Sequence, residues 1–98
     1  MRIEFHPEAF EEMLESARFY EERAAGLGGD FLAAVEETTR RIWQFPAAAP
    51  IESSGVRKRL VFGFPFTILY ERQEDVIFIA AVMHQYRKPG YWKDRLRI

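Results

Sequence analysis

The pattern of apolar and polar residues divides the first half of the chain into three elements. An alternating stretch at Arg2–His6 predicts a short strand. From Pro7 to Ala24, apolar residues recur every three or four positions, which predicts an amphipathic helix. The same spacing predicts a second helix from Asp30, the expected N-cap, to Phe45. The glycine-rich residues 26–29 between them predict that the two helices form an antiparallel hairpin.

The second half of the chain has the pattern of strands. Residues 46–55 show no periodicity and are expected to form an exposed connection. The ranges Val56–Phe62, Pro65–Arg72 and Val76–Met83 predict three strands, and the short turns between them favour antiparallel hairpins. The third strand is apolar throughout, which is typical of a strand inside a sheet with both faces covered. Residues after Gly90 are expected to form a short helix or an extended tail.

These elements give the order β-α-α-β-β-β. They predict an α+β fold in which the helical hairpin packs on one face of a small, curved, mainly antiparallel sheet. A chain of 98 residues with 48% hydrophobic content makes one domain, residues 1–98. It contains no cysteine, which excludes disulfides, thiolate metal sites and a cysteine nucleophile. No apolar run approaches the length of a membrane span and no leader pattern is present, so we expect a soluble, cytoplasmic protein.

The formal net charge of −1 conceals an uneven distribution. Residues 1–52 carry five basic and eleven acidic side chains, a balance of −6, whereas residues 53–98 carry nine basic and four acidic ones, a balance of +5. This division indicates an oriented field, with a polyanion or an acidic protein as the partner of the basic half. The alternative is that the two halves pair with each other in the fold.

The end of the apolar strand carries candidate chemistry at His84. On a period of two, His84 shares a face with Val76, Phe78, Ala80 and Val82. A histidine there is suited to general acid or base catalysis near neutral pH. The alternative, which spacing alone favours, is a histidine at a strand end that is held by one backbone hydrogen bond.

Three arginines form a candidate anion-binding cluster. Arg57 and Arg59 share one face of their strand, and Arg87 follows the apolar strand. Guanidinium groups are suited to bidentate contact with phosphate or carboxylate. The alternative is a solvated outer face with scattered salt bridges, and the spacing does not decide between them.

Aromatic side chains lie among the cations near the C-terminus: Tyr86, Tyr91 and Trp92. Such a set is suited to stack on bases or to receive a partner peptide. Trp43 with Phe45 is expected in the core or in a groove for a partner. His6 and His84 lack metal-ligand spacing, and neither a phosphate-binding glycine loop nor a serine nucleophile motif appears, so we expect no metal or cofactor.

The chain resembles the toxins of type II toxin–antitoxin modules in the RelE/ParE superfamily, most closely the ParE-like, plasmid stabilisation branch. The resemblance covers nearly the whole chain in order. Its distinctive features are a Gly-Leu-Gly between two helices, a Phe-Pro-Phe before the strand that ends at Tyr70, and His84 followed by Arg87, Pro89 and Trp92. The matching stretches are EFHPEAFEEMLESARFYEE, GLGGDFLAAVEETTRRIWQFPAAAP, VRKRLVFGFPFTILYE and IFIAAVMHQYRKPGYW.

The resemblance implies a growth inhibitor that a cognate antitoxin neutralises by covering an exposed apolar groove of the helical hairpin and sheet edge. Operator DNA would be bound only through the antitoxin, no membrane is implied, and a homodimer or toxin–antitoxin hetero-oligomer is possible. ParE-like members inhibit DNA gyrase, whereas RelE-like members cut messenger RNA on the ribosome. A third alternative is an inactive module member that only binds its antitoxin.

The resemblance also assigns roles to residues. If the chain is RelE-like, the candidate catalytic residues are His84, Tyr86 and Arg59, because attack by a 2′-hydroxyl needs an acid, a base and cations at the phosphate. The expected target-binding residues are Arg57, Arg59, Arg87, Tyr91 and Trp92. RelE-type enzymes carry a denser lysine and arginine surface than this chain, so the ParE-like interpretation is preferred.

Overall fold

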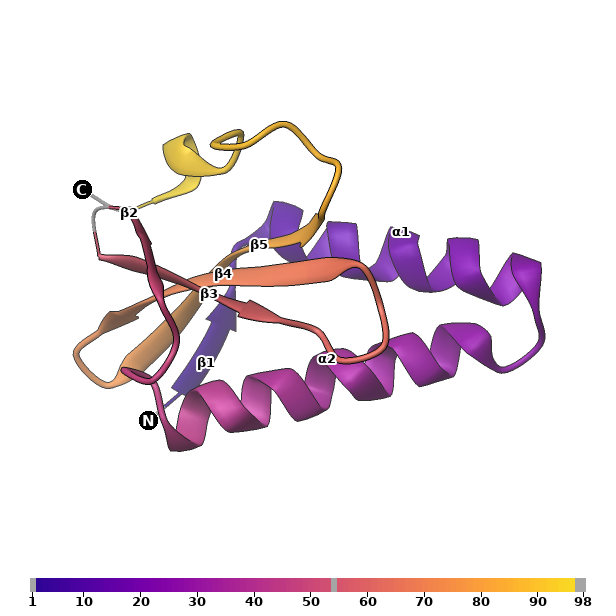
Figure 1. The fold of residues 1–98 in the computed structure, drawn as a ribbon, viewed down its shortest axis with the longest axis horizontal. Coiled ribbons are helices and arrows are strands. Elements are labelled where there is room, and N and C mark those ends of the chain that lie inside the picture. The colour runs from indigo at the N-terminus through magenta and orange to yellow at the C-terminus, as the bar shows by residue number, and fades with distance from the viewer. Residues whose placement is uncertain (1, 54, 97–98) are drawn as a thin grey trace.

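The computed structural model describes residues 2–53 and 55–96 and shows two helices and a five-stranded sheet (Figure 1). The helices and strands follow the expected order, with one additional strand. They are β1 (Arg2–Phe5), α1 (Pro7–Arg23), α2 (Leu27–Gln44), β2 (Ile51–Ser53), β3 (Val56–Leu60), β4 (Phe66–Gln73), β5 (Val76–His84) and a 3₁₀ helix (Lys93–Arg95).

The strands form one mixed sheet in the order β1-β5-β4-β3-β2. β1 is parallel to β5, and the other three pairings are antiparallel. β5 lies between β1 and β4, as its continuous apolar pattern predicted. The predicted α+β fold, with a helical hairpin and a mainly antiparallel sheet, is confirmed.

The additional strand is β2, and the prediction of an irregular connection over residues 46–55 is therefore wrong in part. β2 has three residues, which is too few for a periodicity to be visible in the sequence. The hairpin to β3 turns at Gly55, whose φ of 83° lies in the left-handed region that favours glycine.

The second helix begins at Leu27, and the prediction that it begins at Asp30 is wrong. Its N-cap is Gly26, and the carboxylate that caps it comes from α1: the Glu21 oxygens accept hydrogen bonds from the Gly26 and Gly28 N–H groups at 2.9 and 3.0 Å. Gly28 lies so close to α1 that a Cβ there would be 2.5 Å from the Ala17 carbonyl oxygen. Close packing and capping by the neighbouring helix thus outweigh the low helix propensity of glycine.

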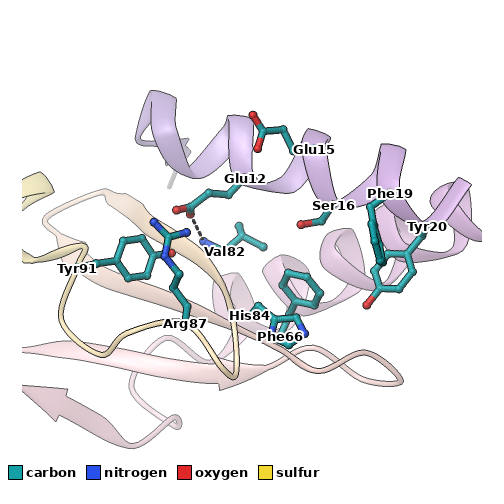
Figure 2. Close-up of a pocket in the computed structure, with 10 residues that line it drawn as sticks. All are labelled: Glu12, Glu15, Ser16, Phe19, Tyr20, Phe66, Val82, His84, Arg87 and Tyr91. Atoms are coloured by element: carbon teal, nitrogen blue, oxygen red, sulfur yellow. Dashed lines mark hydrogen bonds between the residues drawn. The ribbon is translucent and has the colours of Figure 1, made fainter. Parts of the chain in front are cut away.

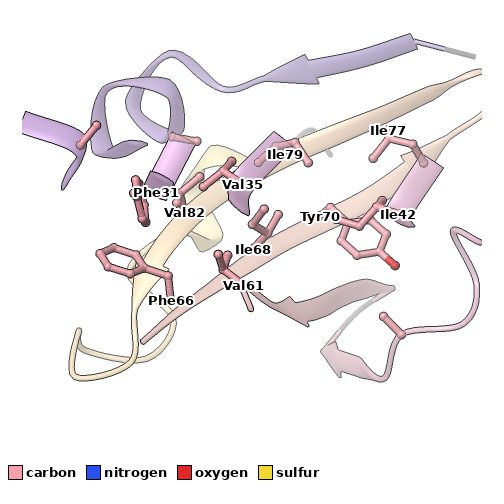
Figure 3. Close-up of a cluster of buried hydrophobic side chains, with 13 residues drawn as sticks. Phe31, Val35, Ile42, Val61, Phe66, Ile68, Tyr70, Ile77, Ile79 and Val82 are labelled. Carbon is pink, nitrogen blue, oxygen red and sulfur yellow. The ribbon is translucent and has the colours of Figure 1, made fainter. Parts of the chain in front are cut away.

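The sheet has a hydrophobic core on each face. On one face, side chains of α1 and α2 such as Ala17, Phe31 and Ile42 pack against Ile68, Tyr70, Ile77 and Ile79 (Figure 3). On the other face, Trp92 packs against Val56, Leu69 and Ala81. The segment after β5 therefore covers the face that the helices leave open, and the alternation of β4 predicted this division correctly.

A β-bulge changes the faces of β5. Leu69 pairs with Ala81 and Tyr70 pairs with Ile79, so Ala80 is an extra residue in the strand. As a result Val82 packs in the same core as Ile77 and Ile79. The prediction that His84 shares a face with Val76, Phe78 and Ala80 is wrong, because the bulge shifts the alternation by one residue.

Neither helix of the described chain is long and apolar enough to cross a membrane.

Candidate functional site

A cavity of about 350 Å³ lies where the end of β5 meets α1, and we call it the α1–β5 cavity (Figure 2). Carboxylates and aromatic rings come from α1, the imidazole from β5, and a guanidinium from the segment that follows. The lining residues are Glu12, Glu15, Ser16, Phe19, Tyr20, Phe66, Val82, His84, Arg87 and Tyr91.

His84 is held by its own strand end. Its Nδ1 accepts a hydrogen bond from the Tyr86 N–H at 3.1 Å, so in the neutral ring the proton is on Nε2. The imidazole packs edge to face on Phe66, with ring centroids 5.1 Å apart, and Tyr86 lies against it at 5.4 Å. This is the arrangement of a strand-end histidine with one backbone hydrogen bond, which was the simpler of the two interpretations.

Tyr91 lies beside two guanidinium groups. The Cζ of Arg87 is 4.0 Å and that of Arg95 4.9 Å from its ring centroid, both within cation–π range. The Tyr91 hydroxyl is buried and has no hydrogen bond of regular geometry among the described residues, although Glu12 is its neighbour. Burial, and then the Glu12 carboxylate, raise the pKa of Tyr91 well above its usual range. The phenol therefore stays neutral and acts as a stacking surface.

Glu12 joins α1, β5 and the C-terminal segment. One of its oxygens accepts the Val82 N–H at 3.1 Å, and the other pairs with the Arg95 guanidinium at 2.9 Å. Arg95 also donates to the Ala80 carbonyl oxygen at 3.0 Å and pairs with Glu8 at 3.2 Å. Burial lowers the pKa of Arg95, but the hydrogen bond to Glu12 and the electrostatic interactions with Glu12, Tyr91 and Glu8 together outweigh it, and the pKa is raised.

Glu12 and Arg95 were not among the residues predicted from the sequence. The available signal was the spacing of Glu8 and Glu12, which places two carboxylates on one face of α1. Nothing in the sequence showed that a residue more than eighty positions later would meet them.

The three arginines do not form a cluster. Arg57 donates from Nη1 to the Ala49 carbonyl oxygen at 2.6 Å and so fastens the loop before β2 to the sheet. Arg87 lines the α1–β5 cavity. Arg59 lines a different cavity, and the two cavities have no lining residue in common. Arg57 and Arg59 both interact electrostatically with Tyr70, whereas Arg87 lies in the α1–β5 cavity, so the three guanidiniums do not form one cluster.

The expected aromatic residues are divided between surface and core. Tyr86 is 84% exposed, Tyr91 is half-buried, and Trp92 is 2% exposed. In this structure Trp92 anchors the C-terminal segment to the sheet and is not available at the surface. Trp43 and Phe45 are both exposed, so the expectation that they lie in the core is wrong.

A second cavity of about 670 Å³ lies between α2 and β3, and we call it the α2–β3 groove. Leu60 and Phe62, two of the most exposed large apolar residues, line it at 75% and 91% exposure. The remaining lining residues are Ala34, Glu37, Thr38, Arg41, Pro50, Lys58 and Arg59. The exposed apolar groove expected for an antitoxin is therefore present.

The basic half of the chain is only partly neutralised by the acidic half. Among residues 55–96, the cations that form ion pairs with described residues are Lys58, with Glu52, and Arg95, with Glu8 and Glu12. The other described cations among residues 55–96 form no ion pair with a described residue. Some cations of the basic half thus pair with the acidic half, as one interpretation expected. The other cations have no ion pair, as the interpretation of a basic surface for a partner expected.

No cluster of three or more possible metal ligands occurs among residues 2–53 and 55–96.

Comparison with known proteins gives a structural neighbour. No family model matches the chain, and no curated protein matches its sequence. A solved structure described as the chromosomal ParDE TA system from P. aeruginosa contains a chain that superposes with a TM-score of 0.62 at 17% sequence identity. The match covers 86% of this chain and 95% of that one. The two chains share their fold. The fold implied by the resemblance is thus confirmed.

Proposed function

We propose that this protein is the toxin of a type II toxin–antitoxin module: a ParE-like inhibitor of bacterial growth whose target is DNA gyrase and which a cognate antitoxin neutralises. The observation that carries the proposal is the shared fold, over 86% of this chain, with a chain of a ParDE toxin–antitoxin system. It agrees with the resemblance in the residues themselves. We place the toxin in the cytoplasm, where its target and its antitoxin are.

The distribution of charges supports an inhibitor that acts by binding. Cleavage of RNA needs several cations around one pentacoordinate phosphate. Here Arg57 is bonded to a loop carbonyl, Arg59 lines the α2–β3 groove, and Arg87 is stacked on Tyr91. The α1–β5 cavity that contains His84 also contains Glu15, whose carboxylate repels a phosphate, and Glu12, which is paired with Arg95.

The antitoxin is the expected partner of the exposed apolar surface. A contiguous apolar surface between α2 and β3 marks an interaction site. Contact with operator DNA would come only through the antitoxin, because the free cations are dispersed over several elements.

A RelE-like nuclease is the second candidate, and one observation favours it. The Nδ1 of His84 is fixed by the Tyr86 N–H, which leaves Nε2 with its proton beside a cavity that also contains Arg87. In that case His84, Tyr86 and Arg59 carry the reaction.

The deciding experiment is inducible expression in a bacterial host with separate readouts of translation and of DNA supercoiling. Arrested replication, a DNA-damage response and intact transcripts are expected. Rapid arrest of translation with cut transcripts would contradict the gyrase proposal and favour the nuclease. If the nuclease is right, the double variant His84→Ala/Arg59→Ala loses toxicity without loss of folding, and toxicity retained by the folded double variant would exclude these residues as catalytic. Harmless overexpression of the folded chain would indicate an inactive member that only binds its antitoxin.

A further inference from the structure

The outer edge of β1 is open. The Arg2 N–H donates to the Asp75 carbonyl oxygen at 2.7 Å. At the other end of β1, the His6 N–H donates to the Ile79 carbonyl oxygen at 2.9 Å. Backbone groups alternate in direction along a strand, so the N–H and C=O of Ile3 point away from β5. β1 is the last strand of the sheet, and no backbone group of the described chain bonds to Ile3 on that side. Another strand can therefore pair with β1 there.

Exposed apolar side chains of both helices lie beside this edge. Phe10 of α1 is 45% exposed and packs edge to face on Phe5 of β1, with ring centroids 5.9 Å apart. Leu32 of α2 is 37% exposed and, with Phe5, lines a hollow of about 250 Å³ between β1 and the helices. The lining residues are Phe5, Met13, Leu32, Val35, Glu36 and Thr39. We call the open edge at Ile3, with Phe10, Leu32 and the hollow, the β1 edge surface. Apolar side chains beside an open sheet edge indicate an interface.

The charged side chains of β1 make this edge complementary to itself. Ile3 and Phe5 pack against the core between sheet and helices, so Arg2 and Glu4 project from the opposite face of the strand. Arg2 and Glu4 pair at 3.4 Å, and their side chains are 73% and 36% exposed. Charges of one sign would repel a second copy of the same strand. A positive and a negative side chain two residues apart can instead pair with each other across two antiparallel copies.

A two-fold axis at Ile3 satisfies the backbone and the charges together. In an antiparallel pair of two β1 strands, Ile3 lies opposite Ile3 of the other copy, and the two residues exchange both hydrogen bonds. Arg2 then lies opposite Glu4 of the other copy, and the axis repeats this pair. The symmetric register centred on Glu4 would place two carboxylates opposite each other, which is destabilising. Charge therefore selects the register centred on Ile3.

We propose that the β1 edge surface binds a second copy of this chain, with the two β1 strands paired antiparallel about a two-fold axis at Ile3. The two sheets join into one sheet of ten strands, five from each copy. The axis is perpendicular to the sheet, so the helices of both copies lie on the same face, and the other copy covers Phe10 and Leu32. β5 and β4 separate β1 from β3, so the α2–β3 groove of each copy stays open. The dimer thus presents two grooves.

Charge reversal tests the register. Arg2→Glu and Glu4→Arg each place like charges opposite each other at two symmetry-related positions. Each is expected to raise the dimer Kd, measured by sedimentation of the purified chain, by at least about tenfold. An equimolar mixture of the two variants brings opposite charges together again. It is expected to form a heterodimer whose Kd is within about threefold of that of the unsubstituted dimer.

The matched controls reverse another exposed arginine–glutamate pair. Arg40 and Glu37 of α2 pair at 3.1 Å, with side chains 57% and 46% exposed. Arg40→Glu and Glu37→Arg are expected to leave the dimer Kd unchanged, because neither residue is part of the β1 edge surface. Circular dichroism verifies that all four variants fold.

Apolar burial and backbone pairing are tested separately. Phe10→Ser is expected to raise the dimer Kd by at least about tenfold. Phe19→Ser, which removes an aromatic side chain of the same helix that is 50% exposed, is expected to leave it unchanged. Hydrogen exchange of the Ile3 amide is expected to slow by at least about tenfold as the chain concentration is raised through the Kd.

Four results would overturn the proposal. One is a chain that stays monomeric up to about 100 μM. Another is a dimer that Arg2→Glu and Glu4→Arg leave intact, with an Ile3 amide that exchanges freely. Dissociation by Glu37→Arg would place the dimer interface at the α2–β3 groove. Protection of the Ile3 amide only after addition of the protein encoded by the adjacent gene would show that a different protein occupies the edge of β1.

Discussion

Glu12 and Arg95 meet 2.9 Å apart beside the part of β5 that β1 does not cover. β1 pairs with β5 only as far as Ile79. Beyond it, the Glu12 carboxylate accepts the Val82 N–H, and the Arg95 guanidinium donates to the Ala80 carbonyl. The pair thus supplies the acceptor and the donor that a neighbouring strand would supply, and it closes this edge of the sheet. The outer edge of β1 has no equivalent closure among the described residues.

Substitution of Glu12 should destabilise the protein strongly. Glu12→Ala leaves the Arg95 side chain, which is 9% exposed, without its main partner and leaves the Val82 N–H unsatisfied. Loss of one partner of a buried pair costs about 3 kcal/mol of unfolding free energy. Urea denaturation measures this, with Glu11→Ala as the control, because its pair with Arg18 is exposed and is worth less than about 1 kcal/mol. Equal costs for the two variants would contradict the proposed role of Glu12.

Substitution by alanine should change the unfolding free energy in opposite directions at two adjacent glycines of α2. Gly28→Ala places a Cβ 2.5 Å from the Ala17 carbonyl oxygen, so we expect a loss of about 2 kcal/mol despite the better helix propensity of alanine. Gly29→Ala meets no atom within 4 Å, and we expect a gain of about 0.5–1 kcal/mol. Thermal unfolding of both variants checks this. A stabilised Gly28→Ala would show that the two helices have room to separate.

The contribution of the Glu21 carboxylate, which caps α2, to the unfolding free energy should be measurable. Glu21→Ala removes the acceptor of the Gly26 and Gly28 N–H groups, and loss of a cap costs about 1 kcal/mol. Glu22→Ala is the matched control, because Glu22 is exposed on the same helix and caps no helix end. Denaturant midpoints of the two variants give the difference. If they coincide, α2 does not depend on a cap from α1.

Substitution of Arg57 should lower the stability of the protein, whereas substitution of Arg59 should not. Arg57→Ala breaks the 2.6 Å bond to the Ala49 carbonyl, and a hydrogen bond of a charged donor is worth about 1.5–3 kcal/mol. Arg59→Ala should leave stability within about 0.5 kcal/mol, because Arg59 has no ion pair with a described residue. Unfolding and growth inhibition are measured for both variants. Loss of stability in Arg59→Ala would contradict its assignment to the binding surface.

Stability should fall at alkaline pH because of three tyrosines that are buried or half-buried. Burial raises the pKa of Tyr20 and Tyr70, and burial together with Glu12 raises that of Tyr91. The unfolded chain releases these protons at about pH 10, while the folded chain still holds them. The stabilisation is therefore complete below pH 10 and is lost as the pH rises above it.

Tyr91→Phe tests the largest of these shifts. The variant should unfold less steeply above about pH 10. At neutral pH it should be as stable as the unsubstituted chain or slightly more stable, since it removes a buried hydroxyl that has no regular hydrogen bond. An unchanged alkaline transition would show that Tyr91 titrates as in the unfolded chain.

The sequence alone determined the order of the elements and the faces of β4. Apolar spacing of 3.6 residues in α1 and α2, and of two residues in β4, follows from local backbone geometry, so it is visible without the fold. The uniform apolar character of β5 likewise placed it inside the sheet. The exposed apolar groove was expected from the resemblance.

Only the tertiary structure decided which residues meet. The bulge at Ala80 reverses the faces at the end of β5, and no local signal announces it. Glu21 caps a helix of which it is not a part, and Glu12 meets Arg95 from the far end of the chain. Arg87 lies in a different cavity from Arg59. Periodicity fixes the direction of a side chain relative to its own element, whereas a contact depends on how the elements pack, and packing is a property of the whole chain.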